Sequence, residues 1–519
     1  MTAEVALFGL KLMERVMADD ENEDPWGFVS KRKTNSSADS DATVEEPDPW
    51  SDLVASRSAG PEEGLTSGVG VTTRSPKRQA GEFRANMGGE SLKRRALPMA
   101  LALALVSVAG FLTETVAATQ LVSLAGAQAL FVVYPLGGVG LIVLALIQFR
   151  FVDQHARLKV IRYASLSYAV AFIVMLVLLG GSIAPIISVG IIYLLGDQLN
   201  FLIPLLIWSL AGDEFNVAEG RKIFGWIIAW TYGGQVLGLA IAASSPLLLQ
   251  SVDIPLYALL IIDPIVCIVI GVWLPFRLRG TFASKGLNKT ETLKESLVGA
   301  RDFINGVPIW RSLLLGSIIT FIGGMTVLLA FMAGEEEVIG TDAASLQIFF
   351  GSVMLGSLLI CLVIQAVFAE RLQNKIGIPG VLLILPIMTV VAGVVLALGI
   401  AFQSLILLAV GLALWFIPRW SIDENARRAA LALVPDERRT RVSFIVDLLP
   451  ISMGLIIAGP LAAIGYFFGM LWLIPAAGAV VTIFAIPLMM KVIRGWEDSL
   501  LNWRLRRRKQ NRTIGLQED

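Results

Sequence analysis

The chain has 519 residues, of which 55% are hydrophobic and only 16% are charged. A soluble domain carries about 25% charged residues, so this composition excludes an ordinary soluble protein and indicates a chain whose main solvent is lipid. The formal net charge is zero, which argues against nucleic acid as a partner.

Residues 1–95 differ in composition from the rest of the chain. They hold 17 acidic and 13 basic residues and no long apolar run. Such a segment cannot bury enough apolar surface to offset the entropy lost on ordering, so we predict a largely disordered cytoplasmic tail. Asp24-Pro25-Trp26 and Asp48-Pro49-Trp50 repeat a short motif. The repeat is either chance or a pair of docking motifs through which Trp26 and Trp50 bind a cytoplasmic protein.

From Leu97 onward apolar stretches recur, each near the twenty or so residues needed to cross the hydrocarbon core of a bilayer. Only helices satisfy their backbone hydrogen bonds over such runs in lipid, so the predicted fold class is all-α with about 12 transmembrane helices. The spans are predicted at residues 97–119, 124–149, 160–181, 184–210, 224–248, 253–275, 311–333, 344–369, 378–400, 403–420, 443–467 and 469–491.

The Lys and Arg residues, 42 in all, fall in alternate connections and in the two tails. The connections on the opposite side have none, and the one after the seventh span carries Glu335-Glu336-Glu337. Because positive charge marks the cytoplasmic side, we predict a multi-pass protein of the cell membrane (inner or plasma) with both termini in the cytoplasm.

The longest connection between spans is charged and follows the sixth span. It divides the predicted spans into two six-helix bundles, 97–275 and 311–491, joined by a cytoplasmic linker at 276–310 and followed by a basic tail at 492–519. This layout is typical of transporters built from two halves, which bind substrate between the halves near the midplane of the membrane.

A charged group at the bilayer centre costs roughly 2.5–3.5 kcal/mol on insertion scales, so each one inside a span is a functional candidate. No Lys or Arg lies in the interior of a predicted span, whereas four acids do: Glu114, Asp197, Asp263 and Asp447. We predict Asp197 as the main acid that couples to protons or contacts substrate, and Glu114 as the second. For Asp263 and Asp447 a role in helix packing is favoured.

Two polar residues follow Asp197 on the same predicted helix. Gln198 is its neighbour, and Asn200 lies three residues on, so Asn200 should share one side of the helix with Asp197. The functional hypothesis is a proton-carrying or cation-binding set. The alternative is that these groups are neutral or hydrogen-bonded and serve helix packing.

Other candidate sites are weaker. Cys267 and Cys361 lie far apart inside apolar runs, which supports neither a disulfide nor a metal site, and the only histidine is His155. No catalytic set of residues is present, so we expect neither an enzyme nor a cofactor. The glycines of Gly137-Gly138-Val139-Gly140 and Gly233-Gly234 are predicted to permit close helix approach.

Three short stretches carry information about the protein's family that composition alone does not. They are Leu205 to Asp213 continuing through Glu219-Gly220-Arg221-Lys222 to Gln235, Arg427 to Arg441 continuing to Asp447 and Gly454, and Gly126-Ala127-Gln128-Ala129-Leu130. Through these three stretches taken together, the chain resembles the ATP/ADP-translocase-type nucleotide transporter branch of the major facilitator superfamily. The resemblance implies a two-halves transporter. By comparison with facilitator-type carriers, Glu219, Arg221 and Lys222 are predicted to make inter-helix charge contacts that gate the transporter, with Asp447 as a further gating residue. The alternative is a solvated loop.

The sequence departs from that branch in its first span. Exchangers of the branch have basic residues there, on an Arg-x-x-Lys-Asp-like pattern, whereas this chain has Thr113-Glu114-Thr115. A cavity lined by acidic residues and no basic ones disfavours the binding of a polyanionic substrate. We therefore expect a secondary transporter that works by alternating access on a neutral or cationic small-molecule substrate, with proton coupling as an option. The alternative is a non-transporting assembly, sensor or scaffold protein of the same fold.

Overall fold

A computed structural model of the chain describes residues 92–154, 157–215, 217–278, 304, 307–431, 434 and 436–497. Among these residues every regular element is helical, and 12 segments are long and apolar enough to cross a membrane. The predicted all-α fold with about 12 transmembrane helices is confirmed. Trp26, Trp50, His155, most of the 276–310 linker and most of the basic tail lie outside the described residues.

The first half contains six membrane-crossing segments. In chain order they are α4 (Leu92–Ala125), η1 (Ala127–Ala129) with α5 (Leu130–Gln154), α6 (Arg157–Gly180), α7 (Pro185–Glu214), α8 (Val217–Leu249) with η2 (Gln250–Val252), and η3 (Leu256–Ile261) with α9 (Ile262–Arg277).

The second half repeats this plan with more interruptions. Its elements are α11 (Pro308–Ile339), α12 (Ala343–Val367), α13 (Ala369–Leu382) with α14 (Ile384–Ala401), α15 (Leu405–Pro418) with η4 (Arg419–Asp423) and α16 (Glu424–Leu431), α17 (Asp436–Phe467), and α18 (Leu473–Ile483). The segment that begins with α18 remains helical almost without a break to Glu497.

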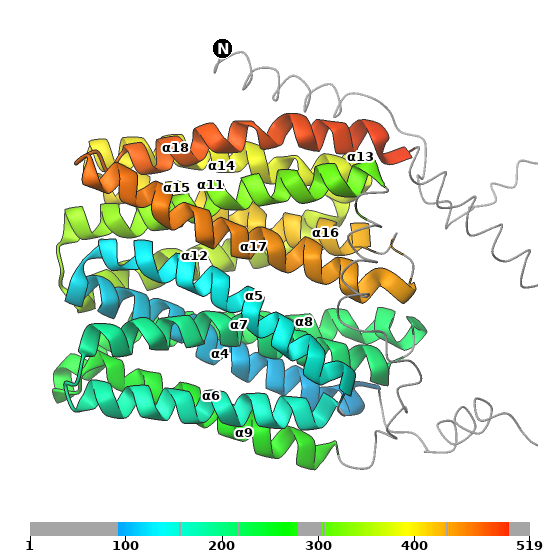
Figure 1. Ribbon diagram of the computed structural model, residues 1–519, viewed down its shortest axis with the longest axis horizontal. Helices are drawn as coiled ribbons and strands as arrows, with labels where there is room; N and C mark the ends of the chain where they lie inside the picture. Colours follow the sequence, from blue (N-terminus) through cyan, green and yellow to red (C-terminus); the bar gives the residue numbers. More distant parts are fainter. Residues whose placement is uncertain are drawn as a thin grey trace, which may run out of the picture. The chain divides into compact units, whose positions relative to one another are not determined.

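Two pairs of helices pack against each other in the corresponding way in both halves. In the first half α4 packs against α8 and α6 against α9; in the second half the corresponding pairs are α11 with α17 and α14 with α18 (Figure 1). Two further corresponding pairs, α5 with α17 and α8 with α12, join the halves. In the view of Figure 1, α5 and α17 lie close together at the left-hand end and diverge toward the right.

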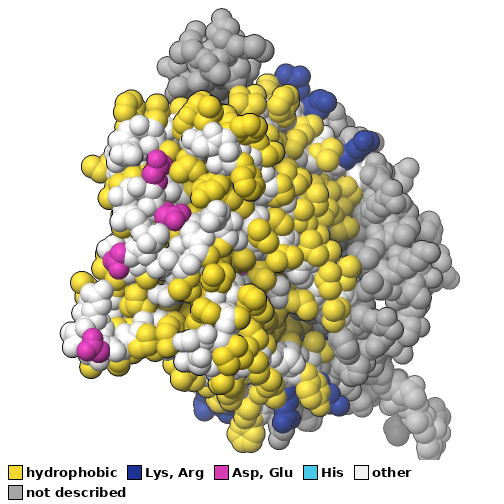
Figure 2. Space-filling view, turned by 60° about the vertical axis from the view of Figure 1, so that its left-hand side comes forward, with side chains coloured by type: hydrophobic (Ala, Val, Ile, Leu, Met, Phe, Trp, Pro, Cys, Tyr) yellow, Lys and Arg dark blue, Asp and Glu magenta, His cyan; other side chains and the backbone are white. Residues whose placement is uncertain are grey.

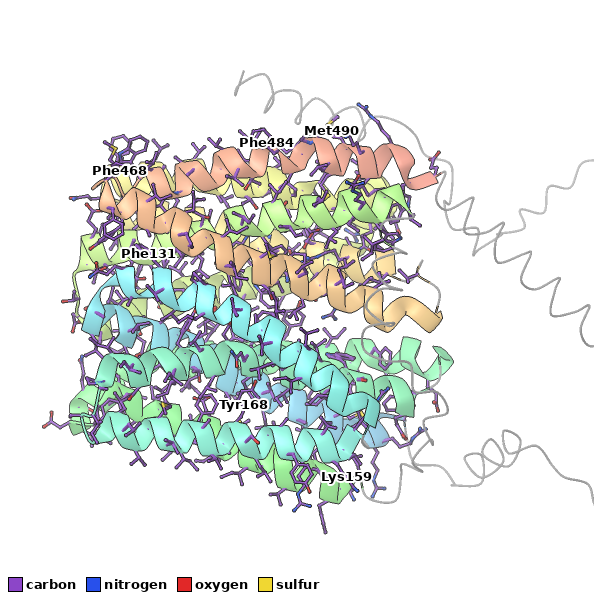
Figure 3. The ribbon with its side chains drawn as sticks, viewed as in Figure 1. Phe131, Lys159, Tyr168, Phe468, Phe484 and Met490 are labelled. Atoms are coloured by element: carbon purple, nitrogen blue, oxygen red, sulfur yellow. The ribbon has the colours of Figure 1, made fainter. Side chains whose placement is uncertain are left out.

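The two ends of the bundle carry opposite charge. We call one the acidic end; it holds Asp253, Glu336, Glu337 and Asp342. We call the other the basic end; it holds Arg95, Lys159, Arg277, Arg371 and Arg494. Figure 2 shows the two groups of charges at opposite ends of an otherwise apolar surface. In Figure 3, Phe468 marks the acidic end and Lys159 the basic end.

Glycines set the distance between the most closely packed helices. Gly234 and Gly238 of α8 face the backbone carbonyl groups of Ala104 and Val108 on α4, and a β-carbon at either glycine would overlap them. Without water to drive association, close backbone approach is what holds membrane helices together. The predicted role of Gly234 is confirmed.

The end of the seventh span differs from the prediction. The sequence placed Glu335, Glu336 and Glu337 in a turn after a span that ends at residue 333, but α11 continues to Ile339. Glutamate is a good helix former, so three acids in a row do not end a helix as they end an apolar run. As a result, Glu335 is fully buried.

Candidate functional site

Helix α4 is the centre of the candidate site. It packs against α7, α8 and α9 of its own half and against α12 of the other. In the half of α4 that leads toward the acidic end, Thr113 and Glu114 point toward different neighbours, because successive residues of a helix are about 100° apart. Thr113 packs against Gly196 of α7 and hydrogen-bonds to Asp263 of α9, whereas Glu114 interacts electrostatically with Asp197 of α7.

Two of the three acids predicted in the first half, Glu114 and Asp197, lie on neighbouring helices, α4 and α7. The carboxyl groups of Glu114 and Asp197 are close enough to interact electrostatically, and both residues are only half-buried. One turn away, Asn200 fills the space that Gly110 leaves on α4. Asn200 therefore lies against α4, whereas Asp197, one turn earlier, lies where α7 faces both α4 and α5. Among the described residues, neither carboxyl group has an ion-pair partner.

The glycine run on α5 has two functions. Gly138 packs against the backbone of Ser452 on α17, which is the close helix approach that the sequence predicts. Gly137 and Gly140 instead leave room for side chains of α7, because Asp197 lies beside Gly137 and Gln198 beside Gly140. The missing side chains on α5 thus create the space that holds the polar residues of α7.

Two tyrosines complete this cluster and were not predicted from the sequence. Tyr134 of α5 and Tyr193 of α7 stack with their ring centroids 6.0 Å apart and their ring planes 13° from parallel. Both interact electrostatically with Glu114 and Asp197. Tyr193 lies one helical turn before Asp197, so this spacing is the sequence signal that could have identified it.

Asp263 lies apart from that pair. Its side chain is fully buried, and Thr113 Oγ1 donates a hydrogen bond to its Oδ1 over 2.5 Å, while its Oδ2 has no hydrogen-bond partner. The contact ties α9 to α4 at the residue next to Glu114. This geometry agrees with the packing role that the sequence favours for Asp263.

At the basic end, one arginine joins three helices. Arg95 of α4 forms ion pairs of 3.0 Å with Glu214 at the end of α7 and with Glu219 at the start of α8. Its guanidinium group also lies over the ring of Phe215, 5.4 Å from the centroid. Glu219 thus makes an inter-helix charge contact of the predicted kind, with Arg95 as its partner.

The other predicted gating residues are less well defined. Arg221 and Lys222 belong to α8, but their side chains lie outside the described part of the structure. Asp447 is half-buried near the start of α17, where it interacts electrostatically with Arg428 of α16.

The tenth span is longer than the sequence predicts. Instead of ending at residue 420 it continues through η4 and α16 to Leu431. The span therefore contains Arg419 and Arg427, which are only 5% and 3% exposed. The prediction that these two arginines lie in a connection between spans is wrong, because both are buried within a continuous helical segment. Hydropathy ended the span at these charges because it cannot register that each charge has a partner.

The partners come from the same helix. Arg419 pairs with Glu424 over 2.6 Å, Arg428 pairs with Glu424 over 2.8 Å, and Arg427 pairs with Asp423 over 2.7 Å. Asp423 and Glu424 stand four residues before Arg427 and Arg428, which is the helical spacing for ion pairs. That spacing is the sequence signal that could have placed this segment on a helix rather than in a loop.

Aromatic rings cover the arginines of this cluster. The guanidinium groups of Arg419 and Arg427 lie 4.9 and 4.8 Å from the ring centroid of Phe321 on α11, and Arg419 also lies 5.2 Å from that of Trp420. Trp420 in turn contacts the first half, because its ring packs against Phe111 of α4 with centroids 5.9 Å apart. The cluster therefore connects the charged part of α16 to the candidate site.

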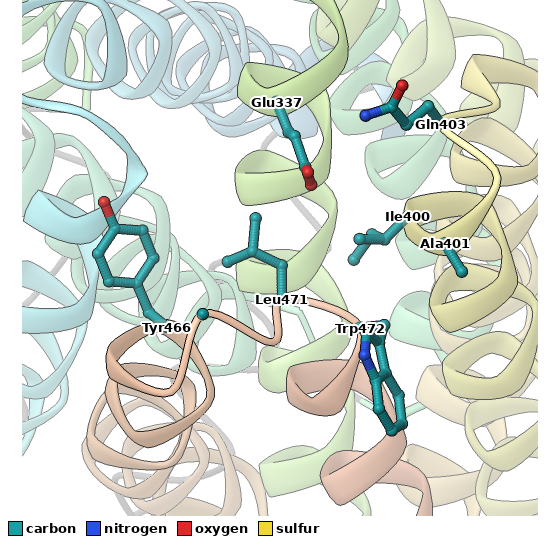
Figure 4. A pocket seen from close by; sticks show the side chains of 8 residues that line it. Glu337, Ile400, Ala401, Gln403, Tyr466, Leu471 and Trp472 are labelled. Atoms are coloured by element: carbon teal, nitrogen blue, oxygen red, sulfur yellow. The ribbon is translucent and has the colours of Figure 1, made fainter.

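A pocket of about 530 Å³ opens at the acidic end, away from the Glu114–Asp197 pair. It lies between the ends of α11, α14, α17 and α18, and Figure 4 shows Glu337 extending toward Leu471 between Tyr466 and Gln403. Its exposed Trp472 is typical of the aromatic residues that membrane proteins place at the lipid–water boundary.

Comparisons of structure identify the fold. The chain is similar to the POT family transporter PepTSo (13% identity, TM-score 0.57), covering 78% of this chain and 98% of that one. It is also similar to a bacterial homologue of the iron transporter ferroportin in an inward-facing state, with 17% identity and a TM-score of 0.54 over 78% of this chain and 100% of that one. A third similar structure is the nucleoside transporter NupG, with 12% identity and a TM-score of 0.53 over 76% of this chain and 98% of that one. These are transporters of the major facilitator fold.

Sequence comparison adds no closer relative: no protein-family model matches the chain, and no curated protein matches it in sequence. At such low identity the structural likeness shows the fold, which is that of major facilitator transporters in two six-helix halves.

Proposed function

We propose that the protein is a secondary transporter that works by alternating access, and that the Glu114–Asp197 pair binds the coupling proton or the cationic group of its substrate. The observation that carries this proposal is the geometry of the pair. Two half-buried carboxyl groups on the adjacent helices α4 and α7 interact electrostatically beside the helices that join the halves, and no described base pairs with them.

The Glu114–Asp197 pair is unfavourable in free energy when both carboxyl groups are ionised and neither binds a ligand. Two like charges held close together in a membrane protein repel each other and are poorly solvated, so one or both must bind a proton or another cation. The hydroxyl groups of Tyr134 and Tyr193, which interact electrostatically with both acids, add dipoles that can adjust when the proton moves. Release of the ligand on one side of the membrane and binding on the other couple the pair to the rocking of the halves.

The choice of substrate class rests on the same residues. The sequence-based argument against a polyanion assumed that the spans contain no base, and the buried arginines of α15–η4–α16 remove that premise. Those arginines are nevertheless matched by acids, since Asp423 and Glu424 pair with them and Asp447 interacts with Arg428. A neutral or cationic small molecule remains the better fit. The resemblance to ATP/ADP translocases makes nucleotides the competing class.

The orientation proposed for the membrane follows from charge. The basic end faces the cytoplasm, which places the predicted tails and linker there, and the acidic end faces outward. Because α5 and α17 contact each other through Gly459 beside Phe131, and Phe131 packs against Tyr466, the halves meet at the acidic end. The structure then corresponds to a carrier closed on its outer side.

A ligand screen tests the proposal. Thermal unfolding of the purified protein should be recorded at pH 6 and pH 8 with nucleosides, amino acids, dipeptides, sugars, ATP and ADP as probes. A ligand present at 100 times its Kd stabilises the folded state by about 2.7 kcal/mol. We expect a neutral or cationic compound to raise the midpoint, with an effect that depends on pH in the wild type and not in Glu114→Gln/Asp197→Asn. Stabilisation by ATP or ADP alone would instead establish the nucleotide class.

A further inference from the structure

The halves are joined at the acidic end by a contact between the end of α11 and the connection from α4 to α5, which contains η1. Glu336 Oε2 accepts a hydrogen bond of 2.7 Å from the backbone N–H of Ala127, and Ser123 Oγ donates one of 2.6 Å to the carbonyl oxygen of Thr341. Gly126 has a φ of 74°, a conformation that favours glycine, and its missing side chain leaves room for the Glu336 carboxylate. A negative charge is also favourable beside the first N–H groups of a helix.

The residue before Glu336 has an unusual environment. Glu335 is 0% exposed, and neither of its carboxyl oxygens has a hydrogen-bond partner. The backbone of Phe350 on α12 approaches the side chain, and the rings of Phe331 and Phe350 pack together one turn away with centroids 5.8 Å apart. The surroundings are therefore apolar on both helices.

No charge near Glu335 compensates it. The titratable groups on the described elements around this end of α11 are Glu336 and Glu337 on the same helix, Asp342 at the start of α12, and Tyr466 on α17. None of them is a base. The described residues also offer no group of three or more His, Cys, Asp or Glu that could hold a metal ion. Only a proton can neutralise the carboxylate where it lies, because an unpaired buried charge costs several kcal/mol.

We propose that Glu335 is a second proton-binding site of this protein, separate from the Glu114–Asp197 pair, and that its proton locks the acidic end closed. Loss of the proton requires water to reach the carboxylate, so the last turns of α11 must leave the core. That movement withdraws Glu336 from Ala127, because the two glutamates are adjacent on one helix. By linkage, opening of the acidic end and release of one proton favour each other to the same extent.

The inference rests on the proposed function in one respect: opening of the acidic end is a step of the proposed transport cycle. The experiment measures a distance and needs no substrate. Spin labels on cysteines introduced at Leu124 and Thr341, which are exposed on either side of the contact, report its separation. Cys267 and Cys361 are buried, and labelling of the wild type gives the background. The purified full-length protein is examined from pH 5 to pH 9.

We expect the ratio of the long to the short distance to rise with pH in the wild type, by up to tenfold per pH unit for one proton. Glu335→Gln should keep the short distance at every pH, since it has the shape of the protonated acid. Glu335→Leu should do the same and serves if the glutamine variant does not fold. Glu337→Gln, an exposed neighbouring acid, should behave as the wild type.

Three results would overturn the inference: no change of distance with pH in the wild type, a wild-type response in both Glu335 variants, or loss of the response in Glu337→Gln. Failure here with pH-dependent ligand binding intact would leave the proposed function standing. A normal distance response without any ligand binding would count against the proposed function and not against this site.

Discussion

Replacing Arg419 with alanine tests whether the charged segment after Pro418 is a buried part of the tenth span. The substitution removes the ion pair with Glu424, at 2.6 Å, and the contacts with the rings of Phe321 and Trp420. Glu424 keeps Arg428 as a second partner, so no acid is left unpaired.

The magnitude follows from these contacts. A hydrogen bond to a charged group contributes about 1.5–3 kcal/mol, and a cation–π contact about 0.5–2 kcal/mol. Removal of one member of an isolated buried ion pair costs about 3–5 kcal/mol of stability. Because Glu424 still pairs with Arg428, the loss expected here is at the lower limit of that range. We expect a loss of about 3 kcal/mol for Arg419→Ala. Arg419→Lys should lose about half of that, because it keeps the charge and not the planar group that stacks.

The assay is thermal unfolding in detergent, followed by the fraction of monodisperse protein. A change of 1 kcal/mol shifts the midpoint by about 2 °C in a large domain, so Arg419→Ala should lower it by about 6 °C. In a double-mutant cycle with Glu424→Gln the two changes should be non-additive. An unchanged midpoint for Arg419→Ala would refute the buried cluster, because an exposed loop arginine is expected to contribute less than about 0.5 kcal/mol.

Three further predictions concern the packing and the helix ends. Gly238→Leu should lower the stability by about 3 kcal/mol or more and reduce the yield of monodisperse protein, since the new side chain meets the carbonyl group of Val108. The control is Gly356→Ala, where no atom lies within 4 Å of the added β-carbon; it should leave the stability unchanged or raise it by up to about 1 kcal/mol. Arg95→Ala should lower the unfolding midpoint and remove the effect of Glu219→Gln, because both changes break the same ion pair; additive effects would contradict this. Asp342→Ala should cost about 1 kcal/mol at neutral pH, because the Asp342 carboxylate accepts a hydrogen bond of 2.9 Å from the N–H of Ser345 at the start of α12. Ser345 lowers the pKa of Asp342, so this contribution is present above the usual carboxyl pKa of about 3.9 and is lost as the pH falls through the lowered value; a midpoint difference that persists at pH 2 would contradict it.

The fold could be predicted from the sequence because lipid leaves few choices. Apolar runs near twenty residues long must be helices, and alternation of basic and non-basic connections limits the number of spans. The same reasoning failed at the ends of the seventh and tenth spans. There Glu335 and Arg419 are charged by type, yet both are buried, one without a partner and one with Glu424.

The candidate site was predictable in part. Spacing on one helix placed Asp197 and Asn200 on the same side of α7, because that relation is local. The approach of Glu114 and the stacking of Tyr134 on Tyr193 depend on how α4, α5 and α7 pack, which no single helix determines. The space that Gly137 leaves for Asp197 is of the same kind, since a glycine indicates close approach without indicating what approaches.

Gradient-driven uptake tests the central claim most directly. The protein is reconstituted into liposomes with the ligand found in the screen, and accumulation is measured with a proton gradient imposed across the membrane. We predict that the wild type accumulates the ligand against its gradient, that Asp197→Asn and Glu114→Gln lose this accumulation, and that Asp253→Asn, an exposed acid at the acidic end, keeps it. Equal gradient-driven accumulation by the wild type and both carboxyl variants would contradict the account.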